Sequence, residues 1–179
     1  MLLLLSWIGT SLGAAEGTGV SVSAREKRAV RIAHRTEAIA RRASAALPPP
    51  LEIDSREAEL IARTLYGECR SCAAIEQAAV AWCILNRADA YQLSVEQVVT
   101  APGQFQGYAA GNPVPEDLYA MAADVLARRA REARGETDVG RVLPADYLWF
   151  YGDGRHNYFR NRYAGGAVWD WSLPSPYII

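Results

Sequence analysis

Apolar residues recur at helical spacing through the middle of the chain, which predicts a mainly helical fold. The pattern predicts helices from Asp54 to about Gly67, from about Ala73 to Asn86, after Ser94, and from Pro115 towards Gly135. The second of these is apolar on most sides, so we expect it to be the central buried helix.

Two of the predicted helices begin with a recognisable start signal. Asp54 with Glu57, and Ser94 with Gln97, have the spacing of a capping box, which satisfies free backbone N–H groups at a helix start. Gly67 either ends the first helix or lets another backbone segment approach closely. Glu68 therefore lies at or near a helix end.

The pattern changes after the last predicted helix, where a run of β-favouring aromatic residues begins. The run Tyr147–Tyr151 is followed by the turn sequence Gly152-Asp153-Gly154 and by a second strand starting at Tyr158. We predict a β-hairpin here. The predicted fold class is therefore α+β, mainly helical, with a small C-terminal hairpin. We expect the aromatic residues near the C-terminus to close over the core or to line a groove; these are Trp169, Trp171 and Tyr177.

The N-terminal region predicts an extension rather than part of the core. Residues 1–15 hold a short apolar run followed by small residues, which is typical of a secretory signal, with an uncleaved anchor as the alternative. Residues 16–50 form a linker or arm that ends in consecutive prolines, which stop a helix. We place the folded domain at residues 51–179.

The charge is unevenly distributed along the chain. The formal net charge is −1, so the whole chain carries no nucleic-acid signature, yet residues 24–46 hold seven basic and two acidic residues. We favour a solvated linker for this stretch. The alternative is a basic arm that binds anionic wall polymer or the membrane surface.

Glu68 is the carboxylic acid around which the chemistry of the chain can be organised. Cleavage of a glycosidic bond needs a protonated acid beside the leaving oxygen, and partial burial among apolar groups favours the protonated form of such an acid. Tyr66 lies close to Glu68 in sequence. The residue types alone leave a solvated surface glutamate as the competing interpretation.

The aromatic C-terminal third offers residues suited to sugar binding. Sugars have flat apolar faces that stack on aromatic rings, and hydroxyl groups that seek polar side chains. Residues of the right types are Gln104, Tyr151, Asp153, His156 and Asn157. The competing interpretation is a hairpin whose aromatics are core and whose glycines only form a turn.

The three cysteines are too few, and odd in number, for a disulfide scaffold. Cys69 with His156 can act as nucleophile and base of a wall-peptide amidase. Cys69 and Cys72 can instead form a redox pair or half of a zinc site, although few further ligands remain. Cys83 falls within the predicted buried helix and is expected in the core.

Several stretches resemble one family in order and spacing, over residues 57–163. They read LIARTLYGECR, EQAAVAWCILNRADA, VVTAPGQF and YLWFYGDGRHNYF. The chain resembles the spore cortex-lytic enzyme family, also called cell wall hydrolases. The stretch GDGRHNYFRNRY differs from spore-type members and is more similar to the versions in phage-related and gut Gram-positive proteins. Cys69 and the residues Arg70-Ser71-Cys72 depart from the usual family pattern.

The resemblance implies a compact single domain similar to lytic transglycosylases, and hence lysozyme-like, acting on peptidoglycan. It implies that Glu68 is the catalytic acid. The family's further motifs match Asn86-Arg87, Pro102–Phe105 (with Gln104 and Phe105) and Gly154, His156 and Tyr158.

We therefore predict a lytic transglycosylase that cuts between N-acetylmuramic acid and N-acetylglucosamine, with Glu68 as acid and then base. The predicted groove walls are Tyr66, Asn86, Gln104, Phe105, Tyr151, Asp153, His156 and Asn157. The alternatives are a hydrolytic muramidase using Glu68 and Asp153, the cysteine amidase, and a non-catalytic wall-binding protein. We expect no cofactor, no metal, a monomer, and a secreted or wall-associated location.

Overall fold

The computed structural model describes residues 27–35, 37 and 51–177. The chain divides into two units, Met1–Pro49 and Pro50–Ile179. Residues 27–35 of the first unit are helical and exposed. Its few apolar side chains include Val30 and Ile32, which are 53% and 57% exposed. The predicted signal at residues 1–15 and the proline run at 48–50 lie outside the described residues.

The first helix of the second unit, α2, spans Ser55–Cys69. The Asp54 side chain caps it, because its Oδ1 accepts from the N–H groups of Arg56 (2.8 Å) and Glu57 (3.2 Å). The buried face of α2 includes Ile61 and Leu65, which are fully enclosed. This face packs on α3, α4 and α5.

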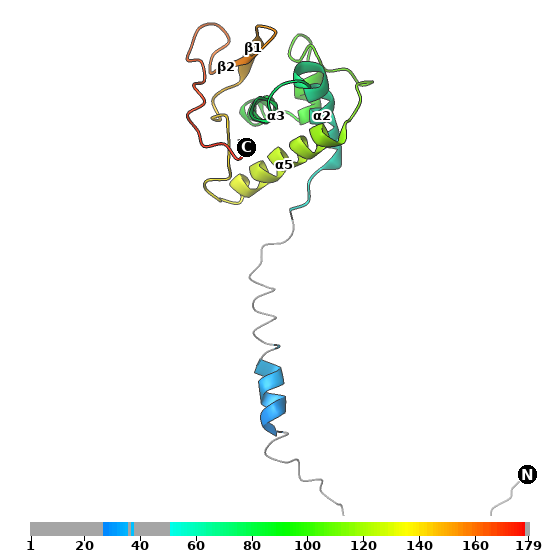
Figure 1. Cartoon of the computed structure of the whole chain (residues 1–179), viewed down its shortest axis with the longest axis vertical. Coiled ribbons are helices and arrows are strands. Elements are labelled where there is room, and N and C mark those ends of the chain that lie inside the picture. Colours follow the sequence, from blue (N-terminus) through cyan, green and yellow to red (C-terminus); the bar gives the residue numbers. More distant parts are fainter. Residues whose placement is uncertain (1–26, 36, 38–50, 178–179) are drawn as a thin grey trace, which may run out of the picture. The chain divides into compact units, whose positions relative to one another are not determined.

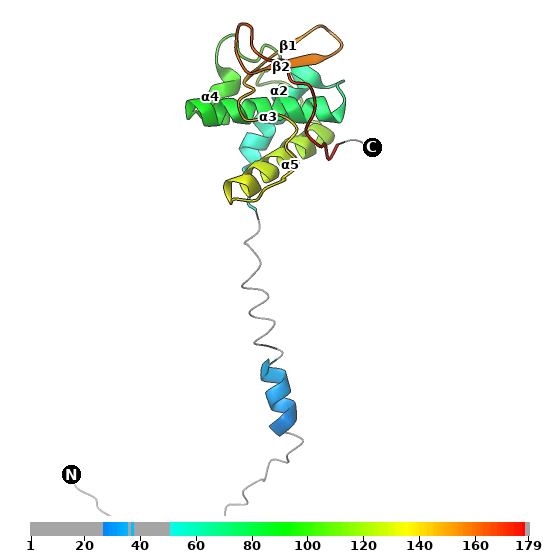
Figure 2. The ribbon, with the colours of Figure 1, turned by 90° about the vertical axis from the view of Figure 1, so that its left-hand side faces the viewer.

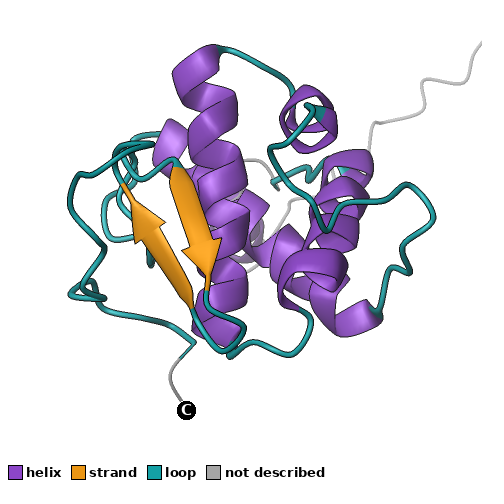
Figure 3. Cartoon of the chain, turned by 90° about the horizontal axis from the view of Figure 1, so that it is seen from above, coloured by secondary structure: helices purple, strands orange, loops and turns teal. Residues whose placement is uncertain are grey.

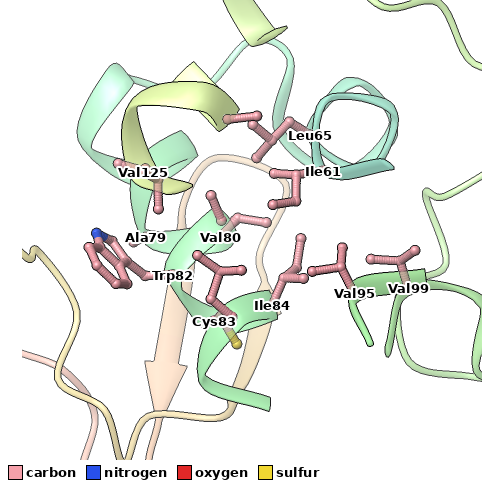
Figure 4. Close-up of a cluster of buried hydrophobic side chains, with 14 of the residues drawn as sticks. Ile61, Leu65, Ala79, Val80, Trp82, Cys83, Ile84, Val95, Val99 and Val125 are labelled. Atoms are coloured by element: carbon pink, nitrogen blue, oxygen red, sulfur yellow. The ribbon is translucent and has the colours of Figure 1, made fainter. Parts of the chain in front are cut away.

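The central helix α3 spans Ala74–Tyr91 and is buried along most of its length. Its side chains meet those of α2, α4 and α5 in the core, where Trp82 and Ile84 are fully enclosed (Figure 4). The helix continues past the predicted end at Asn86 because Arg87, Ala88 and Ala90 are good helix formers. It stops at Gln92, which adopts a left-handed conformation with φ 55°.

The short helix α4 spans Val95–Thr100, and α5 spans Glu116–Ala133. The predicted capping box of α4 is confirmed in both directions, since Ser94 Oγ accepts from Gln97 N–H and Gln97 Oε1 accepts from Ser94 N–H. Helix α5 begins one residue after Pro115. Gly135, with φ +86°, follows its C-terminal end, as the sequence predicts.

The predicted hairpin is confirmed as strands β1, Trp149–Gly152, and β2, Asn157–Arg160, paired antiparallel with Phe150 opposite Phe159. Phe159 is buried in the core. Figure 2 shows α3 lying between the hairpin and α5, and Figure 3 shows both strands alongside α3. Trp169 packs edge-on against Tyr147 and Trp171 against Phe159, so both close over the core.

The predicted fold class, mainly helical α+β, is therefore confirmed. A lysozyme-like relationship stays a prediction. Within the described residues, no helix is both long and apolar enough to span a bilayer.

Candidate functional site

Glu68 lies in the last turn of α2, and its side chain is half-buried. One carboxylate oxygen, Oε1, accepts a hydrogen bond from the backbone N–H of Gly107, with an N–O distance of 2.6 Å. The described residues supply no second partner for this carboxylate. Its other oxygen, Oε2, therefore remains available to a bound molecule.

The loop that carries Gly107 approaches α2 more closely than any side chain would allow. A Cβ atom at Gly67 would lie 1.7 Å from the carbonyl oxygen of Gly107, and one at Gly107 would lie 2.4 Å from the carbonyl carbon of Gly67. Only glycine at both positions permits this contact. Gly67 thus lets the backbone of the Gly107 loop approach α2 closely, which is one of the two roles that the sequence left open.

Asn112 ties the same loop to α2 from its other end. Its Nδ2 donates to the carbonyl oxygens of Arg63 (2.9 Å) and Gly107 (2.8 Å), and Arg63 donates in return to the carbonyl oxygen of Asn112. These bonds hold the Gly107 peptide, and therefore the N–H group that Glu68 accepts, in a fixed position.

A cleft of about 410 Å³ separates the end of α2 from the hairpin. Its lining residues come from these two segments: Gly67, Glu68, Cys69, Arg70, Ser71, Cys72, Phe150, Gly152, Gly154, Arg155, His156 and Asn157. Glu68 is the one carboxylate in this lining. Among the residues that the sequence assigned to the site, the cleft brings together Glu68, His156 and Asn157.

Asn157 joins the two walls of the cleft from beneath. It is buried, its N–H donates to Oε1 of Glu76 (2.9 Å), and its Nδ2 donates to the sulfur atoms of Cys69 (3.3 Å) and Cys72 (3.5 Å). The exposed His156 ring has its Nδ1 3.8 Å from the same Glu76 oxygen. Glu76, in the first turn of α3, therefore anchors the base of the hairpin turn.

Cys69 and Cys72 form a disulfide with each other. In this state neither sulfur is a free thiolate, so neither the amidase nor the zinc hypothesis fits this geometry. Across the described residues, no group of three or more His, Cys, Asp or Glu side chains is placed to hold a metal ion. Cys83 is buried in α3, as predicted, and its burial raises the pKa of the thiol to about 12.

Asp153 closes the hairpin turn and is not part of the cleft lining. Its Oδ1 accepts from the N–H groups of His156 and Arg155, both at 2.8 Å, and its Oδ2 accepts from the Tyr158 hydroxyl at 2.9 Å. These bonds lower the pKa of Asp153, the largest effect coming from the His156 N–H. Because both oxygens are engaged in the turn, Asp153 does not stand opposite Glu68 as a second reacting carboxylate.

Three further residues predicted as groove walls lie away from the cleft. Asn86 is buried, and its Nδ2 donates to the carbonyl oxygens of Pro144 (2.8 Å) and Tyr147 (3.0 Å). Phe105 is buried beneath the Arg87 guanidinium, which also donates to Gln104. These residues connect α3 to the loops around the site, and they do not line the Glu68 cleft.

The two tyrosines predicted at the site lie beside the cleft. Tyr66 is partly buried against the core, with the Arg70 guanidinium 5.2 Å from its ring centre. Tyr151 is 45% exposed and stacks on Tyr158 with ring centres 5.1 Å apart. A second pocket of similar volume holds Tyr151 and shares Phe150 with the cleft; its lining is Trp149, Phe150, Tyr151, Arg160 and Tyr163.

The sequence did not single out several residues that shape this site. Gly107 and Asn112 fall in or beside a stretch rich in small and polar residues, where no local signal separates a contact residue from an exposed one. Phe150 belongs to the aromatic run and gave only a strand signal. Arg70 was noted only as part of a departure from the family pattern, and no sequence signal marked Arg155.

A family model described as Cell Wall Hydrolase matches residues 73–166. The match covers the central helix, the following loops and the hairpin, and it begins after Glu68. The chain belongs to this family, and it is therefore an enzyme that acts on peptidoglycan. No curated protein and no solved structure matches the chain significantly.

Proposed function

We propose that the chain cleaves the glycan strand of peptidoglycan by a lytic transglycosylase mechanism, with Glu68 as the only reacting carboxylate. The observation that carries the proposal is the lining of the cleft, in which Glu68 is the one acidic residue. A hydrolytic glycosidase of the common kind needs two carboxylates flanking the scissile bond. A transglycosylase needs one, because the substrate supplies its own nucleophile.

The hydrogen bond from Gly107 supports a defined role for each oxygen of Glu68. Oε1 accepts the N–H, so the proton of the neutral acid is carried by Oε2, which has no partner among the described residues. Oε2 donates this proton to the glycosidic oxygen between N-acetylmuramic acid and N-acetylglucosamine. The bond from that oxygen to C1 of the muramic acid then breaks.

The second half of the reaction returns Glu68 to its starting state. The C6 hydroxyl of the muramic acid attacks its own C1, and its proton passes to the Glu68 carboxylate. The products are a 1,6-anhydromuramic end and a free N-acetylglucosamine end, and no water is consumed. Exposed aromatic residues beside the cleft, Tyr151 and Tyr163, suit the apolar faces of neighbouring sugars.

Mass spectrometry of digested sacculi tests the reaction. The expected products are anhydromuropeptides. New reducing ends would indicate hydrolysis, and new free amino groups would indicate an amidase; either result overturns the transglycosylase assignment.

Substitution of Glu68 tests the residue. Glu68→Gln keeps the shape of the side chain and removes the transferable proton, so activity should fall by on the order of 10²- to 10⁴-fold. Glu59→Gln, on the exposed face of the same helix, is the matched control and should keep full activity. Undiminished activity of Glu68→Gln would refute the role of this residue.

We also propose that the enzyme is exported, since its substrate lies outside the cytoplasm. The Cys69–Cys72 disulfide supports this proposal, because disulfides persist mainly in oxidising compartments. A fusion of residues 1–50 to alkaline phosphatase, which is active only after export, should be active. An inactive fusion that accumulates in the cytoplasm would contradict export by this segment.

A further inference from the structure

Two arginines in the cleft, Arg70 and Arg155, have no carboxylate partner among the residues that the structure describes. Arg70 follows α2 and Arg155 lies in the hairpin turn, so two separate segments bring them to the lining of the cleft. Both are exposed. Within the described part of the chain, neither guanidinium forms an ion pair or a side-chain hydrogen bond, and Arg70 only lies over the Tyr66 ring.

Most of the other arginines in the folded unit behave differently. Five of them pair with a carboxylate: Arg56, Arg128, Arg129, Arg131 and Arg141. Arg87 is enclosed and donates to Leu148 and Gln104. The cleft therefore combines a single acid with two arginines that have no ion-pair partner in the described part of the chain, whose formal net charge as a whole is −1. Unpaired charges of one sign that converge in a cleft raise the local concentration of an oppositely charged ligand.

The substrate class named above carries suitable negative charge in one place. The sugar backbone of peptidoglycan is neutral, because its amino groups are acetylated. The acidic groups belong to the peptide stem, which is attached to the muramic acid at the bond that Glu68 would cleave. A peptide on that sugar is therefore held at the cleft that Arg70 and Arg155 line together with Glu68.

We propose that Arg70 and Arg155 bind carboxylate groups of the peptide stem, so that the enzyme prefers glycan strands that carry peptides over stripped strands. The inference rests on the proposed function and specifies its substrate. The guanidinium group suits this role because its planar donors match a carboxylate in a bidentate geometry. The Tyr66 ring holds Arg70 at the rim of the cleft and limits the freedom that the side chain loses on binding.

Binding measurements on the full chain test this specificity without catalysis. The Glu68→Gln variant is titrated by calorimetry with peptide-bearing glycan strands and with stripped strands. The stripped strands are prepared with an amidase, and the lactyl carboxylates that this enzyme frees are then capped as amides. It should bind peptide-bearing strands roughly tenfold or more tightly, and added salt should reduce the difference. Equal affinity for both strands overturns the inference.

Variants of the two arginines identify the contact. In the Glu68→Gln background, Arg70→Gln and Arg155→Gln should each weaken binding of peptide-bearing strands by about three- to tenfold and leave stripped strands unaffected. Arg155→Lys keeps the charge but loses the bidentate geometry, so its affinity should be intermediate. Arg162→Gln, exposed and outside the cleft lining, is the matched control. Equal weakening on both kinds of strand would show a general structural effect and would refute peptide recognition.

The two proposals fail in different ways. If Glu68→Gln retains full activity, the assignment of the catalytic acid fails whatever the binding data show. If Glu68→Gln is inactive and binding shows no preference for peptide-bearing strands, the catalytic assignment stands and only the peptide recognition fails.

Discussion

The backbone N–H of Gly107 donates to Oε1 of Glu68 at 2.6 Å, although the two residues lie 39 positions apart in sequence. This bond orients the carboxyl group on which the proposed chemistry depends. It exists because Gly67 and Gly107 bring two backbone segments into direct contact, where a Cβ atom on either residue would overlap the other segment. The Gly107 loop thus orients Glu68, and the contact between Gly67 and Gly107 holds this loop against α2.

Alanine at Gly107 should separate the loop from α2. The added Cβ would lie 2.4 Å from the carbonyl carbon of Gly67, so the backbone must shift and the N–H must move away from Glu68. We expect a loss of at least about 2 kcal/mol in the free energy of unfolding and a marked loss of activity in the folded protein. Urea unfolding and sacculus-clearing assays measure the two effects.

Gly111→Ala is the control for this experiment, since no atom lies within 4 Å of the added Cβ in the same loop. Its stability should change by no more than about 0.5 kcal/mol. If the two variants unfold at the same urea concentration, the contact between Gly67 and Gly107 does not constrain the fold.

Asn112→Ala should loosen the same loop without a clash. It removes donors to the carbonyl oxygens of Arg63 and Gly107, both partly buried, so we expect a cost of about 1 to 3 kcal/mol. The exposed Gln106 gives the control variant Gln106→Ala. Hydrogen exchange at the Gly107 N–H reports the local effect. Unchanged protection of this amide in Asn112→Ala would show that the Asn112 hydrogen bonds do not hold the loop in place.

Reduction of the Cys69–Cys72 disulfide should lower the free energy of unfolding by about 2 kcal/mol, as expected from the entropy of so short a closed loop. Thermal unfolding with and without dithiothreitol measures this change. The Cys83→Ala variant keeps the disulfide and lacks the free, buried cysteine. If dithiothreitol lowers its melting temperature by the same amount as in the parent protein, the effect belongs to the disulfide. The double variant Cys69→Ser with Cys72→Ser should still release glycan fragments. Complete loss of activity would instead support the hypothesis that Cys69 is a catalytic nucleophile.

Asp153 should stabilise the hairpin turn in a pH-dependent way. Its pKa is lowered in the folded protein by the N–H groups of His156 and Arg155 and by the Tyr158 hydroxyl. The stabilisation is therefore complete above the unfolded-state pKa of about 3.9 and is lost as the pH falls through the lower folded-state pKa. Asp153→Asn should melt at a lower temperature than the parent protein at pH 7, and the difference should vanish in strong acid.

Tyr158→Phe is the companion variant, since it removes one of the three donors to Asp153 and leaves the two N–H groups in place. It should show a smaller shift than Asp153→Asn at pH 7. A melting difference that is the same at pH 7 and in strong acid would show that the Asp153 charge plays no part.

Local sequence signals predicted the elements well because their causes are local. The caps at Asp54 and Ser94 act within three residues, and the glycine after α5 acts at a single φ angle. The end of α3 was placed too early, since Asn86 and Arg87 read as a motif although they continue a good helix-forming stretch. The hairpin followed from turn chemistry between two aromatic runs.

The residue types expected in the groove were harder to place. The family resemblance suggested that Asn86 lines the groove, yet a buried amide satisfies backbone carbonyls equally well, and that is its arrangement here. Asp153 suited catalysis by type, but a short turn offered it three donors. A side chain's chemistry is the same in both roles, so only its neighbours distinguish them.

By itself the sequence determined the helices, the hairpin, the importance of Glu68 as a hypothesis, and the resemblance to cell wall hydrolases. Those features depend on periodicity, caps, turns and ordered motifs, all of which are local properties of the sequence. Only the tertiary structure decided that Gly107 would orient Glu68, that Arg70 and Arg155 would line the same cleft, and that Cys69 would pair with Cys72. Such contacts join segments whose separation in space depends on how the whole core packs, and no local pattern encodes that distance.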